Sequence, residues 1–247
     1  MDSSIALTSD SLGSLFVIPE SDWTSISKRV GLTILAKDIA PSIARYLVDF
    51  PALETVCQKW KDTTFPGLIA QSENLSNYCV QARDSWTKLQ QAISGLDPNR
   101  DLPPEVKREA EGVIGSLSQS TASLNQQFAP LSADVLAFTT QNQVIDSHIT
   151  SYTDRLGPDW KSINPSTTAV DKATGLVMGA WQAISDDLNA IATGRIVMTT
   201  QLLLSLDIAS ALLSWEHLRD EAHDFASMAK GQEQYLSGQW IGMGAAG

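Results

Sequence analysis

The sequence predicts an all-α protein, an elongated bundle of about five long helices with coiled-coil packing. Apolar residues recur at helical spacing along most of the 247 residues. One apolar seam steps by threes and fours without a slip from position 106 to position 156. No segment of any length alternates apolar and polar residues as a half-buried strand does. Because 43% of the residues are apolar, the core needs no disulfide scaffold or structural metal.

The amino-terminal part is expected to be an arm followed by a helix. Residues 1–21 hold a short apolar patch among polar residues, which predicts an arm that lies on the bundle. A helix is expected to begin near Trp23, capped by Ser21 or Asp22, and to kink at Pro41. Its apolar stripe consists of Trp23, Ile26, Val30, Ile34, Ile39, Ile43 and Leu47.

A second helical stretch is expected after Pro51, with an interruption at Phe65-Pro66-Gly67 and an end at the turn Gly95–Asn99. Its apolar positions are Leu53, Val56, Cys57, Trp60, Leu68, Leu75, Tyr78, Cys79, Ala82, Trp86, Leu89 and Ile93. Two cysteines are too few for a disulfide scaffold, so Cys57 and Cys79 are expected to be buried free thiols.

The seam predicts one long central helix. Pro103-Pro104-Glu105 is a favourable helix start, with proline in the first turn and an acidic residue at the positive end of the helix dipole. Pro130 is not a seam position, so it is expected to bend the helix outward while the helix stays packed on the core. Asn142 either sets the register or is solvated. The seam positions are Val106, Ala110, Val113, Leu117, Thr121, Leu124, Phe128, Leu131, Val135, Phe138, Asn142, Ile145, Ile149, Tyr152 and Leu156.

The last third is expected to hold two further helices after a polar loop from Gly157 to Thr168. The first spans Ala169–Ala192, and Thr193-Gly194-Arg195 forms a turn. Ile196–Leu213 is the most apolar run of the chain, and its helix is expected to continue to Ala229. The stripe of the first helix is Leu176, Trp181, Ile184, Leu188 and Ile191. The chain is thus divided into the arm, a single bundle domain over residues 22–236, and a flexible tail rich in glycine and alanine over residues 237–247.

Composition and motifs indicate a protein without enzymatic chemistry. The formal charge of -11 repels nucleic acid. No phosphate-binding loop, dinucleotide fingerprint, nucleophile elbow or metal-binding histidine pair is present. Asp220 and His223 have the spacing of half a di-iron motif, but the second half is absent. We therefore expect no catalytic residue, no cofactor, no metal and no small-molecule substrate.

Two passages are similar to the alpha-xenorhabdolysin, cytolysin A and haemolysin BL group of α-helical pore-forming toxins. Residues 57–69, CQKWKDTTFPGLI, continuing to Asn77-Tyr78 and Leu89, resemble the second-helix pattern of the xenorhabdolysin type. Residues 181–191, WQAISDDLNAI, and then Leu206–Ala209, Trp215–Leu218 and Ala222–Phe225, resemble the closing helices of the group. The likeness covers most of residues 22–230.

The resemblance implies a pore-forming toxin component that assembles on a target-cell membrane with copies of itself and a second helical subunit. Members usually carry a hydrophobic head between long helices, whereas the connection here is short and polar. It therefore implies a companion subunit, or insertion through a rearranged terminal helix. The candidate membrane- or partner-contacting residues are Trp23, Ile26, Val30, Ile34, Ile196, Val197, Leu202, Leu203 and Leu204.

The localisation follows from the same features. The amino terminus lacks a basic region and an apolar region, so we expect a chain made in soluble form without a classical signal peptide, and then secreted or released. The alternative function is a non-enzymatic scaffold or adaptor whose long helices dock other helical proteins.

Overall fold

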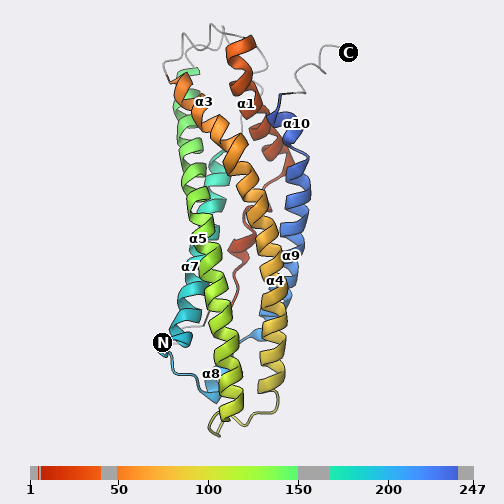
Figure 1. The fold of residues 1–247 in the computed structure, drawn as a ribbon, viewed down its shortest axis with the longest axis vertical. Helices are drawn as coiled ribbons and strands as arrows, with labels where there is room; N and C mark the ends of the chain where they lie inside the picture. The colour runs from red at the N-terminus through yellow and green to blue at the C-terminus, as the bar shows by residue number, and fades with distance from the viewer. Residues whose placement is uncertain (1–4, 6, 40–48, 150–166, 239–247) are drawn as a thin grey trace. The chain divides into compact units, whose positions relative to one another are not determined.

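The computed structural model describes residues 5, 7–39, 49–149 and 167–238, and within these ranges the chain is helical with no strand (Figure 1). The expectation of an all-α protein is therefore confirmed. Pro41 and the loop beyond Gly157 lie outside the described residues. The helices are α1 (Glu20–Ile39), α3 (Phe50–Lys59), α4 (Phe65–Ile93), α5 (Pro104–Ile149), α7 (Thr167–Ala192), α8 (Thr200–Ser205), α9 (Ile208–Lys230) and α10 (Glu233–Leu236), with a 3-10 helix η1 (Asp10–Gly13) and a π turn η2 (Trp60–Thr64).

The long helix predicted from the seam is α5, which runs unbroken for 46 residues. At 1.5 Å per residue it is roughly 70 Å long. Its described seam side chains are buried, except Val106 and Val113, which are half-buried. Ile114 is fully buried in place of Val113, because a straight α-helix drifts by about 20° per heptad from a strict 3.5-residue repeat. The side chain of Ile149 and the seam positions after it lie outside the described residues.

Helix α5 contains a proline, Pro130, and a polar seam residue, Asn142. Pro130 lies inside the helix with its side chain exposed, as the register predicts. Asn142 is buried, and its Nδ2 donates to the Phe138 carbonyl oxygen at 2.8 Å. The Asn142 amide nitrogen therefore bonds within its own helix.

The interruption predicted at Phe65-Pro66-Gly67 is wrong. The chain stays helical from α3 into α4, and η2 widens the helix just before Pro66, where the Phe65 N–H reaches the Trp60 carbonyl five residues back. A proline clashes with the carbonyl four residues before it, and a wider turn relieves that clash. Gly67 lets α4 lie against Leu131 of α5, since a β-carbon there would overlap the Leu131 side chain.

The helix predicted from Ile196 through Ala229 is also wrong. The chain turns at Gly194, whose φ is +74°, forms only the six residues of α8, and becomes extended at Leu206 before α9 begins at Ile208. Asp207 precedes α9, and its carboxylate accepts a hydrogen bond from the Ser210 N–H at 3.2 Å. An aspartate that caps a following helix ends the preceding one, because capping requires a backbone outside the helical region.

The start of α1 and the stripe of α7 each differ from the prediction in one respect. Helix α1 begins at Glu20, so Ser21 and Asp22 lie in its first turn and do not precede it. On α7, Leu176 is exposed, whereas the other stripe residues Trp181, Ile184, Leu188 and Ile191 are buried. The turn predicted at Gly95 is confirmed, with φ at +84° after α4 ends at Ile93.

The described chain divides into two compact units, each with its own core. Unit 1 comprises residues 1–14, 71–128 and 176–223, and its core centres on Tyr78, which contacts the rings of Trp181 and Trp215 edge-on. Within this unit α4 and α5 run antiparallel, since Gln71 bonds Gln127 while Tyr78 bonds Thr121.

Unit 2 comprises residues 15–70, 129–175 and 224–247. In its core Trp23 contacts Phe65 and Phe225, and Trp60 stacks on Phe138 with 4.2 Å between ring centroids. Helix α1 packs against α3 and α10. All five tryptophans placed on apolar stripes by the sequence are buried, as expected: Trp23, Trp60, Trp86, Trp181 and Trp215.

Candidate functional site

The segment 196–213 of unit 1 carries the exposed apolar side chains among the sequence-predicted candidates. Val197 is 72% exposed, Leu204 is 40% exposed and Leu213 is 70% exposed. Ile196 and Leu202 are half-buried, whereas Leu203 points the other way and is fully buried. The exposed side chains are thus spread over three parts of the segment, Val197 before α8, Leu204 on α8 and Leu213 on α9, while Leu203 anchors α8 in the core.

Helix α8 is held in the unit by few polar contacts. Thr199 caps it, accepting a hydrogen bond from the Leu202 N–H at 3.1 Å, and the Thr200 hydroxyl donates to the Arg100 carbonyl at 2.8 Å. That second bond places α8 beside the connection between α4 and α5 (Figure 1). Non-helical backbone flanks α8 on both sides, over residues 193–199 before it and residues 206–207 after it.

Asp207 is the only formal charge of the segment. Hydrogen bonds from the Ser210 hydroxyl and N–H hold its pKa below the usual value, so the carboxylate stays ionised at neutral pH. The apolar side chains of the segment thus flank a persistent negative charge.

The candidates on α1 are arranged differently. Trp23, Ile26 and Val30 are buried in the core of unit 2, and Ile34 is half-buried, so their apolar faces are already occupied. The same helix carries the buried Arg29, whose guanidinium pairs with Asp146 of α5 at 2.5 Å. A membrane role for α1 would require this ion pair and the aromatic core around Trp23 to open.

The described residues provide little material for catalysis. They contain no group of three or more His, Cys, Asp and Glu side chains close enough to hold a metal ion. Asp220 and His223 are both exposed. Cys57 and Cys79 are buried free thiols, and burial raises the pKa of each to about 12, so neither is a thiolate at neutral pH.

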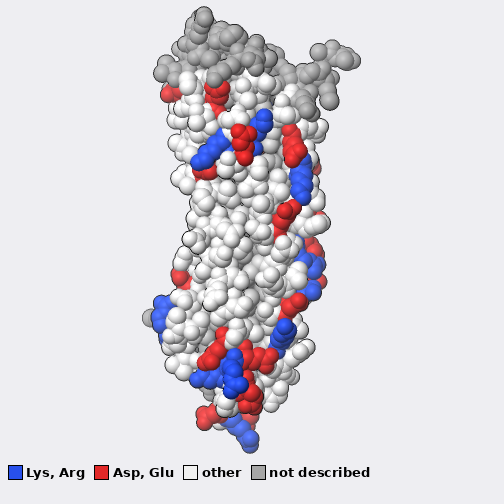
Figure 2. Space-filling model, viewed as in Figure 1, with Lys and Arg blue, Asp and Glu red and all other residues white. Residues whose placement is uncertain are grey.

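On the face that Figure 2 shows, charge does not single out a binding surface. Figure 2 shows Lys and Arg interspersed with Asp and Glu, and no field of one sign covers the visible face. Two cross-helix ion pairs illustrate the mixing, Arg83 with Glu216 in unit 1 and Lys59 with Asp134 in unit 2. Apolar contact is therefore the stronger attraction that the segment 196–213 can supply.

Among the described helices none combines the length and the hydropathy of a bilayer span. Comparisons of the chain with known protein families, with curated proteins and with solved structures found no match.

One feature of unit 1 was missed in the sequence, a polar pocket between α4 and α5. Its residues come from two stretches about forty positions apart, Asn74–Gln81 and Gln119–Gln127. The sequence signal for this pocket is an excess of Asn, Gln and Ser at exposed helical positions. This signal indicates a polar surface but does not indicate a pocket.

Proposed function

We propose that this chain is a component of an α-helical pore-forming toxin, soluble as a monomer, that assembles on a target-cell membrane with copies of itself and a second helical subunit. The observation that carries the proposal is the segment 196–213, in which α8 lies between two non-helical connections and Val197, Leu204 and Leu213 are exposed. The resemblance of residues 57–69 and 181–225 to that toxin group supports it.

The energetics favour a surface contact that becomes strong only on assembly. Full burial of a Val or Leu side chain contributes about 1.5 to 3 kcal/mol, and the three exposed side chains of the segment are already partly covered. A contribution of about 3 to 6 kcal/mol per chain corresponds to dissociation constants from several millimolar to tens of micromolar. Several chains joined in one assembly bind the same membrane together, so their combined affinity rises by orders of magnitude.

The long helices would provide the assembly surface. We include in the proposal that α5 packs in the coiled-coil manner that its seam predicts, and that neighbouring protomers extend this packing. Leu136 of α5, 54% exposed and off the seam, is an apolar side chain that such a neighbour would cover.

Vesicle permeabilisation tests the proposal. We would measure dye release and vesicle co-sedimentation with the chain alone and combined with each protein encoded beside it. The test variant is Val197→Asp with Leu213→Asp, because both side chains are exposed and the fold should survive, as circular dichroism would verify. Leu203→Asp would be uninformative, since Leu203 is buried and its loss would unfold the segment.

Val17→Asp is the matched control, an equally drastic change at an apolar side chain that is 70% exposed and lies outside both the segment and the long helices. We predict that the unchanged chain and the control both associate with vesicles, and that the double variant does not. Absence of vesicle association in every combination, together with a stable complex with a soluble helical protein, would replace the toxin proposal by the adaptor function.

A further inference from the structure

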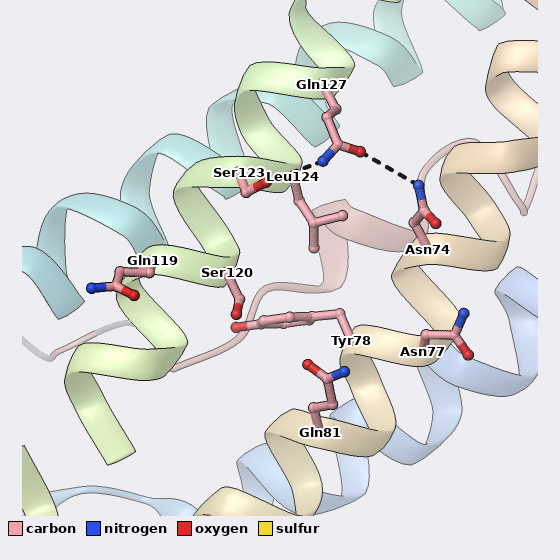
Figure 3. A pocket seen from close by; sticks show the side chains of 9 residues that line it. All are labelled: Asn74, Asn77, Tyr78, Gln81, Gln119, Ser120, Ser123, Leu124 and Gln127. Atoms are coloured by element: carbon pink, nitrogen blue, oxygen red, sulfur yellow. Dashed lines mark hydrogen bonds between the residues drawn. The ribbon is translucent and has the colours of Figure 1, made fainter. Parts of the chain in front are cut away.

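The pocket between α4 and α5 of unit 1 is lined almost entirely by uncharged hydrogen-bonding side chains (Figure 3). Its volume is about 410 Å³, within the range of small-molecule pockets. The chain has 28 acidic and 17 basic residues, yet none of them lines the pocket. The lining residues are Asn74, Asn77, Tyr78, Gln81, Gln119, Ser120, Ser123, Leu124 and Gln127.

One end of the pocket is organised by a small amide network. The side-chain oxygen of Gln127 accepts hydrogen bonds from Gln71 at 3.1 Å and from Asn74 at 3.4 Å, and its Nε2 donates to Ser123 at 3.0 Å. These bonds join α4 to α5 and fix the orientation of the Gln127 amide. This end of the pocket is therefore preorganised.

At the other end the polar groups are uncommitted. Asn77, Gln81, Gln119 and Ser120 make no side-chain hydrogen bond to any other residue that the structure describes. In Figure 3 the Gln81 amide, from α4, and the Ser120 hydroxyl, from α5, lie on either side of the Tyr78 ring. Together they offer both donors and acceptors to a ligand.

Tyr78 forms a rigid aromatic floor. It is 4% exposed, its hydroxyl bonds the Thr121 hydroxyl at 2.8 Å, and its ring lies edge-on to Trp181 and Trp215 with centroids 5.4 and 5.2 Å away. Burial raises the pKa of its phenol, so Tyr78 remains neutral across the physiological range. No group of this pocket acquires a charge near neutral pH.

The chemistry of the lining limits the class of ligand. A charged ligand would lose hydration without gaining a counter-charge, and an apolar ligand would strip water from amides and hydroxyls without replacing their hydrogen bonds. A polyhydroxyl ligand avoids both costs, because each of its hydroxyls both donates and accepts hydrogen bonds.

We propose that this pocket binds a neutral sugar, with Gln81 and Ser120 as hydrogen-bonding residues. The sugar can be free or can be the headgroup of a glycolipid, since the recognised chemistry is the same. This inference is independent of the proposed toxin function, because it concerns a different part of unit 1 from the segment 196–213.

Side-chain amide NMR on the isotope-labelled full chain provides a direct test. The probes are methyl β-galactoside, methyl α-glucoside, N-acetylglucosamine and lactose, with inorganic phosphate as a charged comparison. At least one sugar is expected to shift the side-chain amide resonances of Gln81 and Asn77 saturably, in the millimolar range or tighter, and the Asn77 resonances report binding in variants that lack Gln81. Gln81→Ala combined with Ser120→Ala is expected to weaken binding by about tenfold, as the loss of two hydrogen bonds implies.

Gln126→Ala and Gln90→Ala are the matched controls, since both remove an exposed amide on the same two helices outside the pocket. They are expected to bind like the unchanged chain. The inference is overturned if no sugar of the set shifts these resonances, if phosphate binds at this site more tightly than every sugar, or if the double variant binds the sugar as well as the controls do.

Vesicles of phosphatidylcholine with and without galactosylceramide distinguish the two sources of the sugar. Binding that requires galactosylceramide and is reduced in the double variant assigns the site to a glycolipid headgroup. Binding of free galactoside without vesicle binding assigns it to a free or protein-linked sugar. Neither result depends on dye release, so the sugar site and the toxin proposal can fail separately.

Discussion

Truncation of Phe138 on the seam of α5, compared with truncation of Leu136 two positions away, separates the buried edge of this helix from its exposed side. Phe138 is 2% exposed and stacks on Trp60, whereas Leu136 is 54% exposed. The two residues lie in the same helix and the same unit. Phe138→Ala and Leu136→Ala therefore differ mainly in the burial of what is removed.

The expected difference is large. A buried Phe→Ala substitution costs about 3 to 5 kcal/mol, which combines the lost transfer free energy with the cavity left behind. The contact with Trp60, at 4.2 Å between centroids, belongs to the class of ring pairs that contributes about 0.5 to 1.5 kcal/mol beyond area burial, which places Phe138→Ala toward the upper part of that range. Leu136→Ala should stay within about 0.5 kcal/mol.

Urea denaturation followed by far-UV circular dichroism measures both. Phe138→Ala should lower the midpoint strongly with an unchanged slope, and the melting temperature should fall by roughly 10 °C. Equal losses for the two variants, or a loss below about 1 kcal/mol for Phe138→Ala, would show that the seam is not the packed edge of α5.

Three further predictions concern stability. Cys57 and Cys79 should resist thiol reagents in the native chain and react on unfolding. Because burial raises the pKa of both thiols to about 12, the thiols of the unfolded chain ionise first as the pH rises. Urea titrations should therefore show that the stability present at neutral pH is lost progressively from about pH 9 toward pH 12. Gly31→Ala should cost about 1 to 3 kcal/mol and release α10, because a β-carbon would overlap the Tyr235 carbonyl oxygen; unchanged hydrogen exchange in residues 233–238 would contradict this. Asp207→Ala should fray the start of α9, which would appear as faster amide exchange near Ser210. The unchanged chain should show the same fraying in acid, because the pKa of Asp207 is lowered and the cap is lost once the pH falls below the usual pKa of an aspartate. Equal amide exchange in the variant and the unchanged chain would contradict the capping role of Asp207.

Much of the fold could be predicted because burial repeats along a helix with a fixed period. The seam of α5 and the burial of the five stripe tryptophans follow directly from that period. The turn at Gly95 could be predicted from turn chemistry, because glycine adopts the positive φ found there at little cost.

The errors share a different cause. Phe65-Pro66-Gly67 suggested a break, but a π turn absorbed the proline, a solution that depends on packing against α5 and has no simple sequence signature. In the segment 196–213 the apolar content suggested one helix. There Asp207 caps α9, and this capping ends the preceding helix despite the apolar content of the segment. Leu203 is buried in the core, whereas its neighbour Leu204 is exposed.

The candidate site was predictable only as a segment. Hydrophobicity marked residues 196–213, but which of their side chains face outward depends on the geometry of α8 and its two breaks. The α4–α5 pocket could not be predicted, because Gln81 and Ser120 become neighbours only through the antiparallel pairing of two helices.

A fluorophore at position 197 tests the central claim most directly, that the segment 196–213 contacts a membrane. Val197→Cys can be labelled selectively with an environment-sensitive dye, because Val197 is exposed while both native thiols are buried. We predict a blue-shifted, brighter emission when vesicles and the partner subunit are added, and no change for the same dye at Val17→Cys, which is as exposed as position 197 but lies outside the segment. Emission at position 197 that stays in its aqueous range, under conditions in which the chain associates with vesicles or releases their contents, would contradict the claim.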